Sequence, residues 1–135
     1  METLVAVSIF TLSILSMMAV LSRNISDTNY IKSKMAAEYL AQEGIECVRN
    51  MRDNYVLYTD STLLTWADFK VEWISSPEPQ INCLIDDPDF SGFARTIAMT
   101  EITPDEVRVE SKVEWVQESG DFEIILTENL FNWTE

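Results

Sequence analysis

The chain opens with a long run of apolar and uncharged positions. From Thr3 to Ser22 there are twenty residues without a charge, a proline or a glycine. A helix rises about 1.5 Å per residue, so this run would form a helix roughly 30 Å long, the thickness of the hydrocarbon core of a bilayer. Its apolar side chains would occur on every face, and the rest of a small chain cannot surround such a rod. We therefore expect the segment to lie in lipid or among copies of itself.

A second, one-sided pattern follows the first. Small and apolar residues recur at spacings of three and four, which is typical of one face of an amphipathic helix. Between the two patterns, Ser22–Asn29 is rich in Ser, Asn, Asp and Thr, which are poor helix formers. We predict one long helix from about Glu2 to Asp53, with its weakest stretch at Ser22–Asn29. Its apolar face is formed by Ala37, Ala41, Gly44, Val48, Met51 and Tyr55, and Leu40 and Cys47 flank this face.

The second half of the chain has the period-two pattern of strands. In Glu106–Gln117, apolar residues alternate with charged ones, which is typical of an antiparallel strand with one buried face. Residues 118–121 (Glu-Ser-Gly-Asp) predict a tight turn into the next strand. We expect Trp66, Trp73, Phe90 and Phe93 to lie in the core or at its rim, and Phe131 and Trp133 to close it. The predicted strands are Phe69–Ile74, Asn82–Ile85, Ala94–Ile102, Glu106–Gln117 and Phe122–Thr127.

These patterns together predict an α+β fold. A long N-terminal helix, apolar in its first half and amphipathic in its second, packs on a small antiparallel sheet. We place the apolar helix at residues 1–29 and the globular head at residues 30–135, with the amphipathic helix at 30–54 and the sheet at 55–135.

Composition and charge restrict the function classes. The 135 residues carry a net charge of −14. Residues 1–53 contribute −1 and residues 54–135 contribute −13, so the head is acidic and unsuited to nucleic acid. There is no His, which excludes Ser-His and Cys-His catalysis, and two Cys are too few for a Cys₄ cluster. We expect no enzyme activity, no cofactor and no metal site, and we interpret the acidic residues Asp86, Asp87 and Asp89 as a solvated loop. Cys47 and Cys83 either form a disulfide after export or remain buried thiols.

Glu2 is unusual, because a carboxylate beside an apolar helix of bilayer length is costly unless a cation meets it. The opening METLVAVSIFTLSILSMMAV resembles the mature N-terminus of bacterial type IV pilins and their pseudopilin relatives. The stretch AAEYLAQEGIECVRNMRDN is similar to the amphipathic half of pilin helices. In this resemblance Glu2 aligns with the family's near-invariant Glu, and a basic leader and about three residues would precede Met1.

The resemblance implies a structural role. Glu2 would pair with the N-terminal amine of a neighbouring subunit, and the chain would pass from the inner membrane into a helical filament of identical subunits at the bacterial cell surface. A prepilin peptidase and a pilus assembly machinery would be its partners. The predicted assembly residues are Glu2, Thr3, Leu4, Val5, Val7, Ile9, Phe10, Leu12, Ile14, Leu15, Met17, Met18, Val20 and Leu21.

Two alternatives to a major pilin stay open from the sequence. One is a minor pilin or secretion pseudopilin, which shares the same helix. The other belongs to a different class: an extracellular binding module held in the membrane by a single span.

Overall fold

The computed structural model describes residues 1–57, 65–75, 83, 85, 88–117 and 119–132. Its elements are the helices α1 (Glu2–Leu57) and α2 (Trp66–Ser75), the short 3₁₀ helix η2 (Pro88–Phe90), and the strands β1 (Phe93–Thr103), β2 (Glu106–Gln117) and β3 (Gly120–Phe131). The predicted α+β class is confirmed. The chain divides into two units, Met1–Lys34 and Met35–Glu135. The head is therefore Met35–Glu135, which begins five residues later than the predicted 30–135.

Helix α1 is continuous from Glu2 to Leu57, close to the predicted Glu2–Asp53. It stays helical through Ser22–Asn29, where we expected the weakest stretch. Thr28 Oγ1 donates a hydrogen bond to the carbonyl oxygen of Asn24 at 2.7 Å. The Thr28 side chain thus bonds to the helix backbone itself and does not interrupt the helix.

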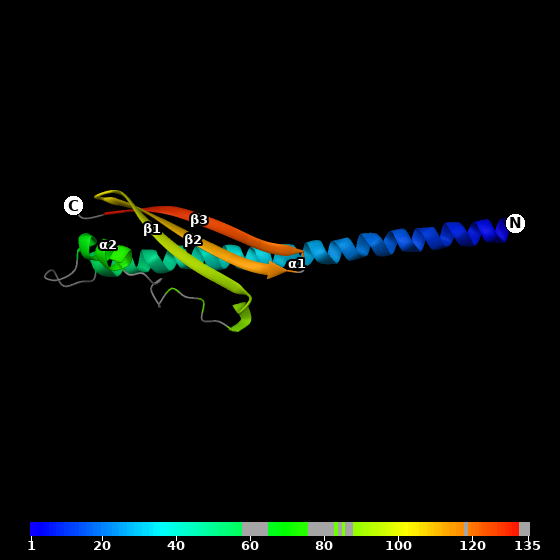
Figure 1. Ribbon diagram of the computed structural model, residues 1–135, viewed down its shortest axis with the longest axis horizontal. Helices are drawn as coiled ribbons and strands as arrows, with labels where there is room; N and C mark the ends of the chain where they lie inside the picture. The colour runs from blue at the N-terminus through cyan, green and yellow to red at the C-terminus, as the bar shows by residue number, and fades with distance from the viewer. Residues whose placement is uncertain (58–64, 76–82, 84, 86–87, 118, 133–135) are drawn as a thin grey trace. The chain divides into compact units, whose positions relative to one another are not determined.

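The three strands form one antiparallel sheet in the order β1-β2-β3, and Figure 1 shows them side by side. The β1–β2 register runs from Phe93↔Trp115 to Thr103↔Glu106, with an irregularity between Glu101 and Thr103. The β2–β3 register runs without a shift from Glu106↔Phe131 to Gln117↔Gly120. Gly120, the first residue of β3, has a φ of +135°, a conformation that favours glycine.

The core of the head lies between α1 and one face of the sheet. On β2, Val107, Val109, Ser111, Val113 and Trp115 are buried, and the intervening residues of the strand lie on the opposite face. The predicted alternation on β2 is therefore confirmed. On α1, the buried residues Ala37, Leu40, Ala41, Gly44, Ile45 and Val48 include most of the predicted apolar face.

Helix and sheet approach each other closely at Gly44. A Cβ atom at this position would lie 2.5 Å from Ser111 Oγ and 3.0 Å from Arg95 Cδ. Real side chains do not tolerate the shorter distance, so glycine allows the helix to pass this close to β1 and β2. Ser111 Oγ is buried and has no hydrogen-bond partner among the described residues.

The prediction of a strand at Phe69–Ile74 was wrong, because these residues belong to α2. The physical reason lies at the start of this helix. The backbone N–H and the hydroxyl of Thr65 both donate to Asp68 Oδ2 at 2.7 Å, and Asp68 N–H lies 3.4 Å from Thr65 Oγ1, which forms a capping box. Trp66, Phe69 and Trp73 are buried at helical spacings of three and four, and this spacing outweighs the strand-like composition.

The other expectations for the head have mixed outcomes. Trp66 and Trp73 are buried and Phe90 and Phe93 are half-buried, as predicted. Phe131 is 47% exposed, so its predicted core position was wrong; its neighbour Leu130 points inward instead, since successive strand residues face opposite sides. Strand β3 extends beyond the predicted Phe122–Thr127 at both ends. The prediction of a strand at Asn82–Ile85 was wrong at the two residues that the structure describes there, because Cys83 is in a 3₁₀ conformation and Ile85 belongs to no helix or strand. Asp86 and Asp87 of the predicted solvated loop, and Trp133 of the predicted core, lie outside the described residues.

Candidate assembly site

The apolar segment Thr3–Ser22 is exposed along its whole length. Every residue from Met1 to Asn29 is exposed, and the large apolar side chains from Leu4 to Leu21 keep between 44% and 77% of their surface accessible. By length and composition α1 is long and apolar enough to cross a membrane, and its most apolar stretch is not buried. All the predicted assembly residues from Glu2 to Leu21 thus lie on one helix with their side chains uncovered.

The hydroxyl groups inside this segment bond to the helix itself. Ser8 Oγ donates to the carbonyl oxygen of Leu4 at 2.8 Å, and Thr11 Oγ1 donates to that of Ser8 at 2.9 Å. Ser13 and Ser16 bond in the same way to Ile9 and Leu12. These polar groups therefore need no water, and the segment meets its surroundings mainly through apolar atoms.

Glu2 lies in the first turn of α1 and is exposed. A negative charge at this end of a helix is favoured by the helix dipole. No ion pair joins Glu2 to any other residue that the structure describes. Its carboxylate is therefore available to a cation from outside the chain.

In the head, a disulfide joins Cys47 of α1 to Cys83, with the two Cα atoms 5.9 Å apart. The buried Arg95 of β1 holds the same two segments together. Its guanidinium donates to the carbonyl oxygen of Cys83 at 2.6 and 2.9 Å, to that of Leu40 at 2.7 Å, and to Glu43 Oε2 at 2.8 Å. We did not predict this role from the sequence, although the inward register of residue 95, between the half-buried Phe93 and buried Ile97, was a usable signal.

A second arginine links α1 to β3. Arg49 donates to Glu46 on its own helix and to Glu128 on the strand. Hydrogen bonding to Glu128 is the main reason why the pKa of the Arg49 guanidinium is raised above its ordinary value. The spacing of three places Glu46 beside Arg49 on the helix, whereas Glu128 is 79 residues away and could not be found by local reasoning.

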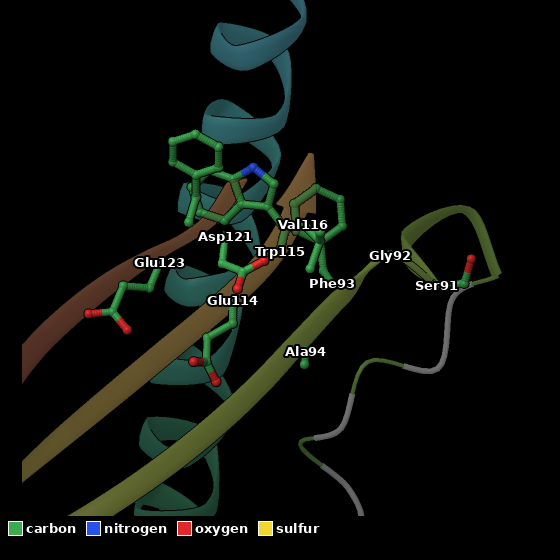
Figure 2. Close-up of a pocket in the computed structure, with 10 residues that line it drawn as sticks. Ser91, Gly92, Phe93, Ala94, Glu114, Trp115, Val116, Asp121 and Glu123 are labelled. Carbon is green, nitrogen blue, oxygen red and sulfur yellow. The ribbon is translucent and has the colours of Figure 1, made fainter. Parts of the chain in front are cut away.

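The end of the sheet carries an open recess of about 450 Å³. Figure 2 shows its lining, which includes the carboxylates of Glu114, Asp121 and Glu123 and the loop at Ser91 and Gly92. The rings of Phe93, Trp115 and Phe122 follow one another across the three strands, with centroids 6.1 and 5.6 Å apart. This recess was not predicted, because it depends on cross-strand register.

Comparison of the chain with protein-family models, with curated proteins and with solved structures found no match.

Proposed function

We propose that this chain is a structural subunit, most simply the major pilin, of a type IV pilus-like filament at the bacterial cell surface. It polymerises through the apolar segment Thr3–Ser22, and Glu2 pairs with the N-terminal amine of a neighbouring subunit. The head faces water on the outside of the filament, and the inner membrane holds the subunit before assembly.

The observation that carries this proposal is the complete exposure of the apolar segment. Side chains from Leu4 to Leu21 are uncovered on every face of α1. Burying such side chains against other apolar groups gains about 25 cal/mol per Å² relative to water. In the membrane, lipid tails cover these apolar side chains, and in a filament the identical segments of neighbouring subunits cover them.

Glu2 supports a filament over a simple anchor. A membrane anchor does not require a carboxylate at the edge of its apolar run, because insertion depends on the length and apolarity of the run. A filament gains a selective contact, since the hydrophobic effect distinguishes poorly between lipid and a packed bundle of apolar helices. The pairing of Glu2 with the amine then sets the axial position of each subunit relative to its neighbour.

The test is the variant Glu2→Ala in cells that assemble the full chain. We expect filaments in the sheared surface fraction to fall by about tenfold or more, while the amount of chain in the membrane stays the same. Asp27→Ala is the matched control, because Asp27 is an exposed acidic residue on the same helix and lies outside the apolar run. It should assemble like the wild type.

An anchored binding module gives the opposite result. Glu2→Ala would then leave both membrane insertion and surface exposure of the head unchanged, and electron microscopy would show no polymer of the wild-type chain. That pair of observations would overturn the proposal.

A further inference from the structure

Charge is divided sharply between the two units of the chain. Met1–Lys34 contains three basic and two acidic residues, a net charge of +1. Met35–Glu135 contains six basic and 21 acidic residues, a net charge of −15. A nearly neutral unit therefore precedes a strongly acidic head within the same chain.

The basic residues of the two units differ in their partners. In the head, Arg49, Arg52, Lys70, Arg95 and Lys112 each form an ion pair with a carboxylate, and Arg108 Nε lies 3.3 Å from Asn129 Oδ1. Arg23, Lys32 and Lys34, which we call the basic segment, are exposed on α1 and form no ion pair with any residue in the described part of the chain. Three unpaired cations thus lie within twelve residues of one helix.

At the recess at the end of the sheet, carboxylates outnumber the cations that pair with them. Lys112 Nζ contacts Glu114 Oε1 at 2.9 Å and Glu123 Oε2 at 2.8 Å, so one cation serves two carboxylates. These two residues face each other directly across β2 and β3, and Asp121 lies two residues further along the same face. Among the described residues, Asp121 has no ion pair. Lys112, Glu114, Glu123 and Asp121 together carry a charge of −2. Hydrogen bonding to Glu123, and to a smaller extent to Glu114, raises the pKa of the Lys112 ammonium above its ordinary value.

We propose that the basic segment of one subunit docks on the acidic recess of a second copy of this chain, with Lys32, Lys34 or Arg23 contacting Glu114, Asp121 and Glu123. This inference rests on the proposed filament, in which each subunit meets identical neighbours. The charges are complementary, because the basic segment holds three unpaired cations and Glu114, Asp121 and Glu123 are exposed on the sheet face that points away from the core. In the assembled fibre this contact neutralises part of the repulsion among acidic heads and complements the apolar packing of the helices.

The first test is zero-length carbodiimide cross-linking of filaments assembled from a mixture of light and heavy isotope-labelled subunits. We expect peptides that join Lys32 or Lys34 to Glu114, Asp121 or Glu123, with half of them pairing a light and a heavy chain when the two labels are mixed equally. Cross-links from these lysines only to other carboxylates, or only within one chain, would overturn the inference.

The second test is charge reversal with rescue. The variant with Lys32→Glu and Lys34→Glu, and the variant with Asp121→Lys and Glu123→Lys, should each lower the yield of filaments about tenfold, equivalent to about 1.4 kcal/mol. Combining the four substitutions should restore at least a third of the wild-type yield. Glu38→Lys with Glu106→Lys is the matched control for the head, because it makes the same charge change away from the recess and should leave the yield unchanged.

The outcomes separate this inference from the proposed function. If Glu2→Ala abolishes filaments while both charge reversals assemble normally, the filament stands and the docking contact is wrong. If the lysine reversal lowers binding of the full chain to phosphatidylglycerol vesicles and leaves assembly unchanged, the basic segment serves the membrane, and the inference is again overturned. If the wild-type chain forms no filament, both proposals fail together.

Discussion

The two units of this chain use similar residues in opposite ways. In the head, Ala37, Ala41 and Val48 of α1 are completely buried against the sheet. In the first unit, Val5, Leu12 and Leu15 of the same helix keep more than half of their surface exposed. The difference is one of pattern: the head part of the helix is apolar on one side, which a three-stranded sheet can cover, and the first part is apolar on all sides.

A one-sided helix is satisfied within its own chain, whereas a helix that is apolar all round requires an environment that the chain does not supply. The head should therefore respond to substitutions as an ordinary folded domain, through its own stability. The first unit should respond through membrane insertion and assembly, with little effect on the stability of the head. Substitutions can test this separation.

The largest expected effect is on the head. Replacing both Cys47 and Cys83 by Ser opens a link between residues 36 positions apart, which should lower the free energy of unfolding by about 4 kcal/mol. Urea unfolding of the full chain in detergent, followed by tryptophan fluorescence, measures this loss. Membrane insertion should stay the same; a loss of insertion would show that the two units are not independent.

The next effect concerns the first unit. Leu12→Lys places a charge inside the apolar segment, which costs about 3 kcal/mol for a lysine near the centre of a membrane helix. We expect a large fall in filament yield with no change in the unfolding free energy of the head. Gln42→Lys adds the same charge on an exposed face of α1 in the head and should assemble normally. Wild-type yield from Leu12→Lys would contradict the proposed burial of this segment.

A smaller effect is expected where helix and sheet approach each other. Gly44→Ala introduces a Cβ atom 2.5 Å from Ser111 Oγ, and overpacking of this kind costs about 1–3 kcal/mol, partly offset by the better helix propensity of Ala. We expect a net loss of about 1 kcal/mol in the unfolding free energy. Gly92→Ala, which meets nothing within 4 Å, is the control and should be close to neutral.

The smallest effect is expected at Ser111. Its buried hydroxyl has no hydrogen-bond partner among the described residues, so Ser111→Ala should leave the head equally stable or up to about 1 kcal/mol more stable. The same substitution removes the nearest atom to residue 44, and it should therefore reduce the cost of Gly44→Ala. Strictly additive effects in the double variant would contradict the close approach described above.

Sequence periodicity predicted the parts of the fold that depend on local repetition. The spacing of Ala37, Ala41 and Val48 gave the buried face of α1, and the alternation along Glu106–Gln117 gave the buried face of β2. Helix α2 was missed because aromatic and β-branched residues suggested a strand, although Thr65 and Asp68 already carried a capping box. A helix start signal should have outweighed composition there.

Contacts between distant segments could not be predicted in this way. Arg95 donates hydrogen bonds to the backbone carbonyl oxygens of Leu40 and Cys83. Because every residue has a backbone carbonyl, the identity of these residues does not reveal the contact. The recess at Glu114, Asp121 and Glu123 depends on the register of β2 with β3, which only the folded sheet defines. The exposure of the apolar segment, by contrast, could be predicted from the sequence, because its length and lack of charge already indicated a helix that the rest of the chain cannot cover.

The most direct measurement is electron cryomicroscopy of surface filaments from cells that produce this chain, with the protein identified by mass spectrometry. We expect a helical polymer in which the Thr3–Ser22 segments of many subunits pack together at the centre and the acidic heads form the outer surface. If the chain is absent from every surface filament and is recovered from the membrane only as a detergent-solubilised monomer, the central claim is wrong.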